Sequence, residues 1–204
     1  MGHKSLVKAG YEAIASEYAK DRETNSEEDV ILLDDFISRL PKGSLVLDAG
    51  CGVGVPVAVV LSRLFQVVGL DFANAQLRLA HAQVPLADLV MGDMTDLPFR
   101  EGCFDGVSSY YAIIHVPREE HRHLVREIYR VLKPSGVALM CMGEHDLASD
   151  VAEYMGTQMF WSHFDGTTNE RILLENGFEV LWAKSVVDFE DPSTSHRFFL
   201  VRKR

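Results

Sequence analysis

Short apolar runs alternate with amphipathic segments along most of this chain. Residues 45–47 are apolar throughout, which is typical of a strand buried on both faces of a parallel sheet. Residues 57–64 carry apolar side chains one and two helical turns apart, which indicates a helix that packs back on that strand. Further strands are predicted at residues 66–70, 87–91, 104–109, 137–142, 178–187 and 196–202. The chain is therefore expected to have an α/β fold.

Residues 1–42 show no strand pattern and are expected to form an N-terminal helical cap. A second helix is predicted from Ser26 to Leu40, ahead of the helix-breaking Pro41. The first helix is indicated by four positions that share one face, Val7, Tyr11, Ile14 and Tyr18. On this pattern alone, the first helix is a cover that packs on the domain.

Residues 143–166 are irregular in pattern and too long for an ordinary connection. This segment follows the carboxyl end of a central strand, and ligands bind at that edge of such sheets. A lid or substrate-side insert is therefore expected. Its aromatic and Met side chains suit an apolar or planar acceptor, which His163 or Asp165 could orient. An insert whose apolar side only covers the core fits equally well. After it, Thr167 and Glu170 predict a capping box for the next helix.

The first strand runs into a turn with glycine at three alternate positions, Gly50, Gly52 and Gly54. Glycine allows backbone conformations that a Cβ atom forbids, so a ligand can approach the backbone at the mouth of the following helix. Free N–H groups and the helix dipole suit an anionic or strongly hydrogen-bonding group there. Asp48 precedes the turn, and its charge would repel a pyrophosphate and attract an amino group.

The spacing disfavours two common nucleotide-binding motifs. A dinucleotide fingerprint needs a third glycine where this chain has Val55 or Val57, and the Gly-Lys-Ser or Gly-Lys-Thr end of a phosphate loop is absent from the sequence. Asp71 lies 21 positions after Gly50, at the end of the second predicted strand. A carboxylate at that spacing reaches the ribose hydroxyls of an adenosine ligand. Together with the glycine turn, Asp71 therefore favours binding of a ribose, whereas Asp48 and the failed fingerprint disfavour a dinucleotide cofactor.

Composition and charge narrow the function classes. The 204 residues, 47% of them hydrophobic, suit one domain spanning residues 1–204. A net charge of −10 disfavours nucleic acid, because binding along phosphates needs clustered cations. No apolar run approaches the ~20 residues of a membrane span, and the sequence has no secretory h-region, so we expect a cytoplasmic location. The three cysteines lack metal-binding spacing, so we expect reduced thiols and no metal site.

Residues 48–54 resemble the first motif of class I S-adenosylmethionine-dependent methyltransferases. The resemblance extends over nearly the whole chain, and residues 130–136 resemble the family's usual entry to its fifth strand. Residues 110–121 and 160–165 resemble one small uncharacterised subfamily of the type 11/25 kind. The resemblance implies a three-layer Rossmann-like methyltransferase fold. Its seven-stranded sheet would be mostly parallel, with an antiparallel last strand.

The resemblance also implies S-adenosylmethionine as the cofactor. Asp71 would bind the ribose, and Asp93 would accept a hydrogen bond from the adenine amino group with Met94 at the ring. The N-terminal helix would fold over the cofactor, so that Tyr18 and also Tyr11 help to close the site. The cofactor-binding residues expected in this way are Tyr18, Asp48, Gly50, Cys51, Gly52, Gly54, Asp71, Phe72, Asp93, Met94 and Tyr110.

Methyl transfer from a sulfonium depends mainly on positioning and desolvation, so a dedicated base is optional. If the acceptor must lose a proton, His115 is the first candidate base and His163 the second, because imidazole titrates near neutrality. Tyr111 is a further catalytic candidate by its position in the family. A buried structural role explains each histidine equally well.

The sequence thus predicts a methyltransferase acting on an unidentified small-molecule acceptor, without a nucleic-acid or membrane partner. Two alternatives stay open, a non-catalytic S-adenosylmethionine-binding protein and a protein-modifying methyltransferase. An acceptor cavity that opens onto the cofactor would distinguish an enzyme from a binding protein.

Overall fold

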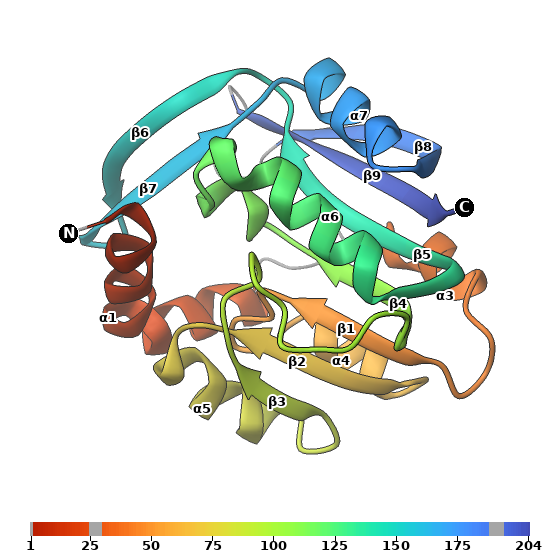
Figure 1. Cartoon of the computed structure of the whole chain (residues 1–204). Helices are drawn as coiled ribbons and strands as arrows, with labels where there is room; N and C mark the ends of the chain where they lie inside the picture. The colour runs from red at the N-terminus through yellow and green to blue at the C-terminus, as the bar shows by residue number, and fades with distance from the viewer. Residues whose placement is uncertain (1, 25–29, 188–193) are drawn as a thin grey trace.

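The computed structural model describes residues 2–24, 30–187 and 194–204, and its main feature is a sheet between helices (Figure 1). The described residues form a seven-stranded sheet in the order β3-β2-β1-β4-β5-β9-β8. Strand β9 is antiparallel to both neighbours, and the other pairs are parallel. The strands are β1 (Leu45–Ala49), β2 (Gln66–Asp71), β3 (Asp88–Met91), β4 (Phe104–Ser109), β5 (Leu132–Gly143), β8 (Phe178–Val187) and β9 (Ser195–Lys203). The predicted mostly parallel sheet with an antiparallel last strand is confirmed.

Helices cover both faces of this sheet, which gives three layers. One face carries α6 (His121–Val131) and α7 (Gly166–Glu175), and the other carries α3 (Leu33–Ser38), α4 (Val57–Ser62) and α5 (Asn74–Gln83). Two short 3-10 turns, η1 (Ile113–His115) and η2 (Arg118–Glu120), lead from β4 into α6. The predicted start of a second helix at Ser26 lies outside the described residues.

Strand β5 shows why the central strands lack polar alternation. All six side chains from Val137 to Met142 are buried. Successive residues of a strand face opposite sides of the sheet. Accordingly, Ala138, Met140 and Met142 pack in the core under α6 and α7, whereas Val137, Leu139 and Cys141 pack in the core under α3 and α4. A strand covered on both faces needs apolar residues at every position.

The segment predicted to be irregular is mostly a β-hairpin, so that part of the prediction is wrong. Strands β6 (Leu147–Tyr154) and β7 (Thr157–His163) pair antiparallel and are joined by Met155 and Gly156. Both turn residues have positive φ, 48° and 78°, as a two-residue hairpin turn of the I′ type requires. Asn-Gly is the usual signal for this turn, and Met-Gly gives none. The side chains of β6 are also largely exposed, so they show no apolar alternation.

Helix α7 begins two residues earlier than its predicted capping box places it. The N-cap is Asp165, whose carboxylate accepts hydrogen bonds from the backbone N–H and the hydroxyl of Thr168, each at 2.9 Å. An Asp side chain at this position satisfies an otherwise unpaired N–H of the first turn. The predicted capping pair of Thr167 and Glu170 is therefore wrong, and the carboxylate of Asp165 stabilises a helix.

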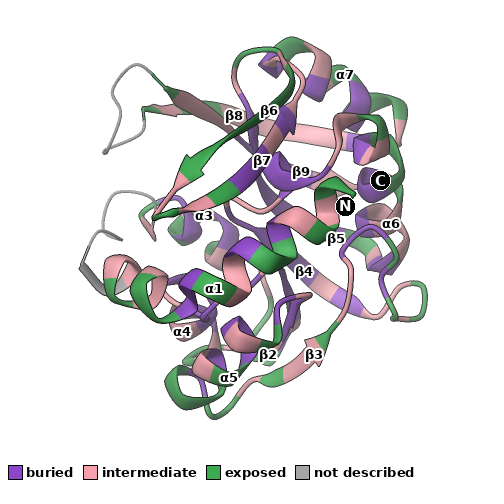
Figure 2. Cartoon of the chain, turned by 90° about the vertical axis from the view of Figure 1, so that its left-hand side faces the viewer, coloured by how far each residue is buried: buried purple, intermediate pink, exposed green. Residues whose placement is uncertain are grey.

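The N-terminal helix α1 (His3–Thr24) lies across the carboxyl ends of the parallel strands, between the hairpin and α5 (Figure 2). Its apolar face packs against Met159 and Phe160 of β7 in a small separate core. Aromatic residues of the hairpin, Tyr154 and Trp161, join the same cluster. The insert therefore holds α1 in place with its aromatic side chains.

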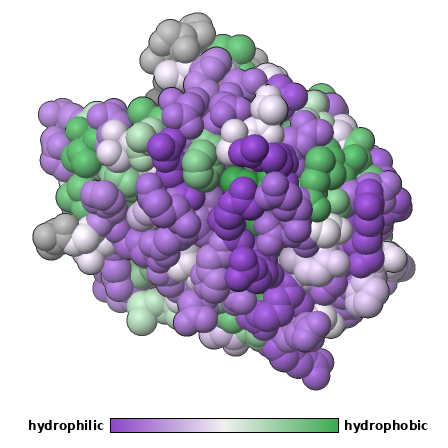
Figure 3. Space-filling model, turned by 45° about the horizontal axis from the view of Figure 1, so that its top comes forward, coloured by the Kyte–Doolittle hydropathy of each residue, from purple (hydrophilic) through white to green (hydrophobic). Residues whose placement is uncertain are grey.

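One face of the molecule shows how polar and apolar side chains are distributed on the surface. The face seen in Figure 3 is mainly hydrophilic, and its hydrophobic residues form small separate groups. In the described parts of the chain, no helix is long and apolar enough to cross a membrane.

The turn after β1 depends on backbone conformations that favour glycine. Gly50 and Gly54 have φ values of 77° and 83°. A Cβ atom on Gly50 would lie 2.2 Å from the Cβ of Ala112, and one on Gly54 would lie 2.4 Å from the side chain of Val84. The turn therefore packs as closely as bare backbone allows, both against the segment after β4 and against the end of α5.

Replacing Gly50 with Ala tests this close packing. The variant should lose roughly 2–4 kcal/mol of unfolding free energy in urea, because the positive φ and the contact with Ala112 are both unfavourable. Gly102→Ala is the matched control, since Gly102 has a φ of 63° and open space around it, and should lose only about 1 kcal/mol. Adding Ala112→Gly should restore part of the loss at Gly50. Equal losses in the two single variants would contradict the packing argument.

Candidate active site

Two hollows meet at the carboxyl ends of β1, β2 and β4. The larger has a volume of about 640 Å³ and the smaller about 360 Å³. They share Tyr18, Gly50, Gly52, Tyr110 and Tyr111 in their walls. Of the other predicted site residues, Asp71, Phe72, Asp93, Met94 and His115 line the larger hollow, and Asp48 and Cys51 line the smaller.

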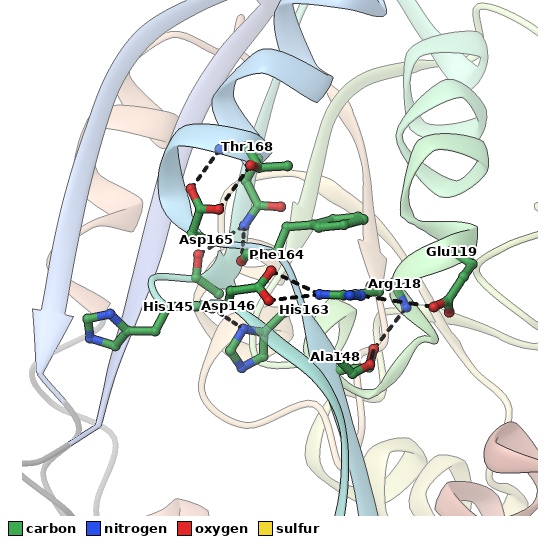
Figure 4. A network of polar contacts seen from close by, with 12 residues as sticks. Arg118, Glu119, His145, Asp146, Ala148, His163, Phe164, Asp165 and Thr168 are labelled. Atoms are coloured by element: carbon green, nitrogen blue, oxygen red, sulfur yellow. Dashed lines mark hydrogen bonds and ion pairs between the residues drawn. The ribbon is translucent and has the colours of Figure 1, made fainter.

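Two predicted residues lie outside both linings as the described residues define them. Gly54 packs against Val84, as described above, so it shapes the turn and does not face the hollows. His163 ends β7, where its Nδ1 bonds the carbonyl of His145 at 2.7 Å. Figure 4 shows His163 in the polar network at the base of the hairpin, beside the ion pair of Arg118 with Asp146. The structure therefore does not bring His163 to the hollows.

The carboxylate of Asp71 joins the glycine turn to the next helix. It accepts hydrogen bonds from the backbone N–H of Gly52 at 3.0 Å and from that of Ala73 at 2.8 Å. Burial raises the pKa of Asp71 to about 6, although these two backbone donors act in the opposite direction. Each carboxylate oxygen has two lone pairs, so acceptor capacity remains for a ligand hydroxyl.

Asp48 lies deeper, under the turn, with 2% of its surface exposed. Among the described residues, the one hydrogen bond to its carboxylate comes from the Ser108 hydroxyl at 2.8 Å. Burial raises the pKa of Asp48 to about 7, and the nearby charge of Asp71 adds to this shift. A cationic ligand group in the smaller hollow would stabilise the ionised form.

Asp93 is held at the far end of the larger hollow by a lysine that the sequence analysis missed. Lys4 of α1 donates to the Asp93 carboxylate at 3.0 Å and to the Thr95 hydroxyl at 2.7 Å, and it also pairs with Glu120. The other Asp93 oxygen accepts from the backbone N–H and the hydroxyl of Thr95. Although burial opposes the change, the Thr95 bonds and the Lys4 cation keep the pKa of Asp93 below its usual range.

Helix α1 is also attached to α5. The Glu12 carboxylate accepts from the backbone N–H of Asn74 at 2.6 Å and from that of Ala75 at 3.0 Å, so it caps the N-terminus of α5. Because α5 has no side-chain cap of its own, this contact serves both helices. Glu12 carried no signal in the sequence, because its partner is 62 positions away.

Gln76 is a second site residue that the sequence analysis missed. It is 1% exposed, lines the larger hollow and donates from Nε2 to the carbonyl of Tyr11 at 3.3 Å. Its Oε1 accepts no hydrogen bond from any described residue. A buried amide oxygen without a partner is unfavourable, so a ligand that donates a hydrogen bond there would be stabilised. Its place in the first turn of α5, five residues after Asp71, was the available signal.

His115 lies in the wall of the larger hollow with both ring nitrogens engaged. Nδ1 is 2.7 Å from the carbonyl of Phe160, and Nε2 is 3.0 Å from the hydroxyl of Tyr11. Burial lowers the pKa of His115 to about 4, so the ring is neutral at pH 7. As the structure stands, no ring nitrogen of His115 is left for an acceptor molecule.

Tyr111 borders both hollows in a strained conformation. Its φ is 51°, in the left-handed region that non-glycine residues rarely adopt. The ring lies edge-on to His196 at 5.0 Å and under the guanidinium of Arg22 at 5.7 Å. Such strain is commonest where a side chain must be placed for function.

S-adenosylmethionine, which the sequence resemblance implies, fits these donors and acceptors. It combines a nucleoside with a cationic amino acid, and the hollows offer buried carboxylates at Asp48 and Asp71, an unpartnered oxygen on Gln76 and a turn of bare backbone at Gly50. A pyrophosphate in the same place would be repelled by the two buried carboxylates. The site is therefore built for hydrogen-bond donors and positive charge.

The raised pKa of Asp48 predicts a pH-dependent effect of Asp48→Asn on stability. The folded protein binds this proton more tightly than the unfolded chain, so wild type loses stability relative to the variant as the pH rises from about 4 to about 7. Urea unfolding without ligand should show Asp48→Asn gaining roughly 2–4 kcal/mol over wild type between pH 4 and pH 8. The same difference at both pH values would contradict the assignment.

Comparisons with known proteins agree with this architecture. Residues 47–140 match the family described as a methyltransferase domain. The demethylmenaquinone methyltransferase of Listeria welshimeri is 34% identical over 108 residues, which are 49% of this chain and 45% of that protein. The tRNA (carboxymethyluridine(34)-5-O)-methyltransferase of Arabidopsis thaliana is 29% identical over 138 residues, covering 67% of this chain and 32% of that protein. The chain thus spans half or less of the length of these curated relatives.

Solved structures show the same fold at low sequence identity. The 1,6-didemethyltoxoflavin-N1-methyltransferase of Burkholderia thailandensis, crystallised with 1,6-didemethyltoxoflavin and S-adenosylhomocysteine, superposes with a TM-score of 0.75 at 18% identity. The alignment covers 98% of this chain and 88% of that one. Residues 47–140 therefore match the methyltransferase-domain family, and the chain has the Rossmann-like fold of this solved methyltransferase.

Proposed function

We propose that this protein transfers a methyl group from S-adenosylmethionine to a small-molecule acceptor. The observation that carries the proposal is the set of acids around the glycine turn. Asp48, Asp71 and Asp93 all reach the two hollows beside that turn. When bound, the cofactor supplies an electrophilic methyl group on a cationic sulfonium.

Each acid would hold a different part of the cofactor. Asp71 and the free oxygen of Gln76 would accept from the ribose hydroxyls, because both line the larger hollow and accept hydrogen bonds. Asp48 would face the amino-acid end, where its charge favours an ammonium group. Asp93 would accept a hydrogen bond from the adenine amino group. Lys4 now donates to the same carboxylate, so it would either donate beside the adenine amino group or give up this bond when the cofactor binds.

A small acceptor is supported by the way α1 closes the larger hollow. Lys4, Val7, Tyr11 and Tyr18 of this helix all line it. A duplex or a folded RNA would need a wider opening, and the net charge of −10 opposes binding along phosphates. One relative acts on tRNA, so an RNA acceptor is the alternative that an activity screen must include. The cytoplasmic location stays a prediction.

Cofactor choice can be tested by thermal melting with S-adenosylhomocysteine and with NAD. A ligand at 100 times its dissociation constant stabilises the folded state by about 2.7 kcal/mol. For a domain of this size, S-adenosylhomocysteine should raise the melting midpoint by roughly 5–10 °C, and NAD should not raise it. A shift with NAD alone would overturn the proposal.

Gln76→Met tests the oxygen without a partner. Removing that acceptor should weaken S-adenosylhomocysteine binding roughly tenfold in calorimetry, because a buried hydrogen bond to the ligand is lost. Gln83→Met is the matched control on the exposed end of the same helix and should leave the affinity unchanged. Equal affinity in Gln76→Met and wild type would remove Gln76 from the site.

Methyl transfer itself is tested by a screen of hydroxyl, amine and carboxylate acceptors together with unmodified tRNA. Release of S-adenosylhomocysteine in the presence of a small molecule supports the proposal. Release with tRNA alone would identify an RNA methyltransferase. Binding without release for any of these acceptors would favour a non-catalytic binding protein or a protein-modifying methyltransferase.

A further inference from the structure

Tyr11 and His115 meet in the wall of the larger hollow, from elements 104 positions apart in the chain. The Tyr11 hydroxyl lies 3.0 Å from Nε2 of His115, and the two rings meet edge to face at 5.5 Å. Gln76 bonds the carbonyl of Tyr11, and Glu12 caps α5 one residue further along α1. The pair is therefore assembled only when α1 is docked.

The hydrogen bonds of His115 fix which group donates to which. The carbonyl of Phe160 can only accept, so Nδ1 carries the proton of the neutral ring and Nε2 is an acceptor. Tyr11 therefore donates its single proton to Nε2. The lone pairs of the Tyr11 oxygen remain, and they can only accept a hydrogen bond.

The surroundings of the pair indicate what kind of molecule would donate that bond. Val7, Tyr18, Tyr110 and Val116 line the same hollow with apolar or aromatic surface. The acids and Gln76 of this hollow are assigned above to the cofactor, so its apolar and aromatic walls beside Tyr11 suit a planar ring that carries one hydrogen-bond donor. A carboxylate or phosphate would place its own hydrogen-bond-accepting oxygens against the Tyr11 oxygen, which can also only accept.

We infer that Tyr11 is a catalytic residue that contacts a neutral hydroxyl group on a planar acceptor, and that His115 positions Tyr11 and takes the proton through it. This inference rests on the proposed methyltransferase function. It also reassigns His115, which the sequence placed next to the acceptor, to a place behind Tyr11.

The step balances in atoms and charge. The acceptor oxygen forms a bond to the methyl carbon, and the carbon–sulfur bond breaks with its electron pair left on sulfur. The acceptor proton moves to the Tyr11 oxygen while the Tyr11 proton moves to Nε2 of His115. The positive charge of the sulfonium is thereby replaced by that of an imidazolium, so the net charge in the hollow is the same before and after the step.

A weakly basic histidine is sufficient for this transfer. The acceptor proton becomes strongly acidic only as its oxygen gains the methyl group, so no ionised hydroxyl is needed beforehand. Burial also raises the pKa of Tyr11 well above its usual range, which keeps Tyr11 protonated and able to relay. General-base assistance of this kind typically contributes a factor of ~10²–10⁴ in rate.

The contact can be tested without turnover by comparing two fluorescent probes, 2-naphthol and its methyl ether 2-methoxynaphthalene. They differ at the hydroxyl that Tyr11 is expected to bind. With S-adenosylhomocysteine bound, wild type should bind 2-naphthol about 5–10 times more tightly than the ether, as one buried hydrogen bond predicts. Tyr11→Phe should abolish this preference. Tyr129→Phe, a tyrosine of α6 outside both linings, should keep it.

Single-turnover transfer to 2-naphthol gives the second readout. Tyr11→Phe and His115→Asn should each lower the rate about 100-fold, and the double variant should be no slower than the slower single one, because both act in one relay. His123→Asn, at an exposed site on α6, should keep the wild-type rate. Multiplying losses, or a rate unchanged in Tyr11→Phe, would overturn the inference.

The two proposals fail in different ways. If S-adenosylhomocysteine does not bind, the proposed function falls and this inference falls with it. If it binds but wild type does not distinguish 2-naphthol from its ether, or if Tyr11→Phe still does, only the role of Tyr11 is overturned.

Discussion

The carboxylate of Asp71 is the constraint on which the site depends. It accepts one backbone hydrogen bond from the glycine turn and one from the start of α5, so it fixes two ligand-facing segments relative to each other. Burial makes its ionised form unfavourable, and its pKa rises to about 6. The site is thus built around a charge that a hydrogen-bond-donating ligand would stabilise. Gly50, which leaves no room for a Cβ atom, keeps the turn close to the segment after β4.

Helix α1 adds a second level of organisation, because each of its polar contacts reaches a different part of the site. Lys4 bonds Asp93, Glu12 caps α5, and Tyr11 bonds His115. The hairpin supports the same helix from outside through Met159 and Phe160, and the Phe160 carbonyl orients His115. Docking of α1 therefore closes the hollow and assembles the polar groups that face an acceptor in a single event.

The sequence predicted the sheet because its strands are buried on both faces and read as apolar runs, as β5 shows. It predicted Asp48 and Asp71 because both follow directly from the first two strands. The hairpin escaped prediction because β6 is exposed and its turn is Met-Gly. Lys4, Glu12 and the Tyr11–His115 pair depend on contacts between distant segments, which local patterns do not encode. His163 is an example of the opposite error. Its segment was expected to face the acceptor, but the side chain bonds the carbonyl of His145 at the base of the hairpin.

The most direct test of this account is a crystal structure of the protein with S-adenosylhomocysteine. The account predicts ribose hydroxyls at Asp71 and Gln76, the adenine ring between Asp93 and Met94, and the amino-acid end above Gly50 and Asp48. A ligand bound elsewhere, or bound here with these carboxylates directed away from it, would contradict the account.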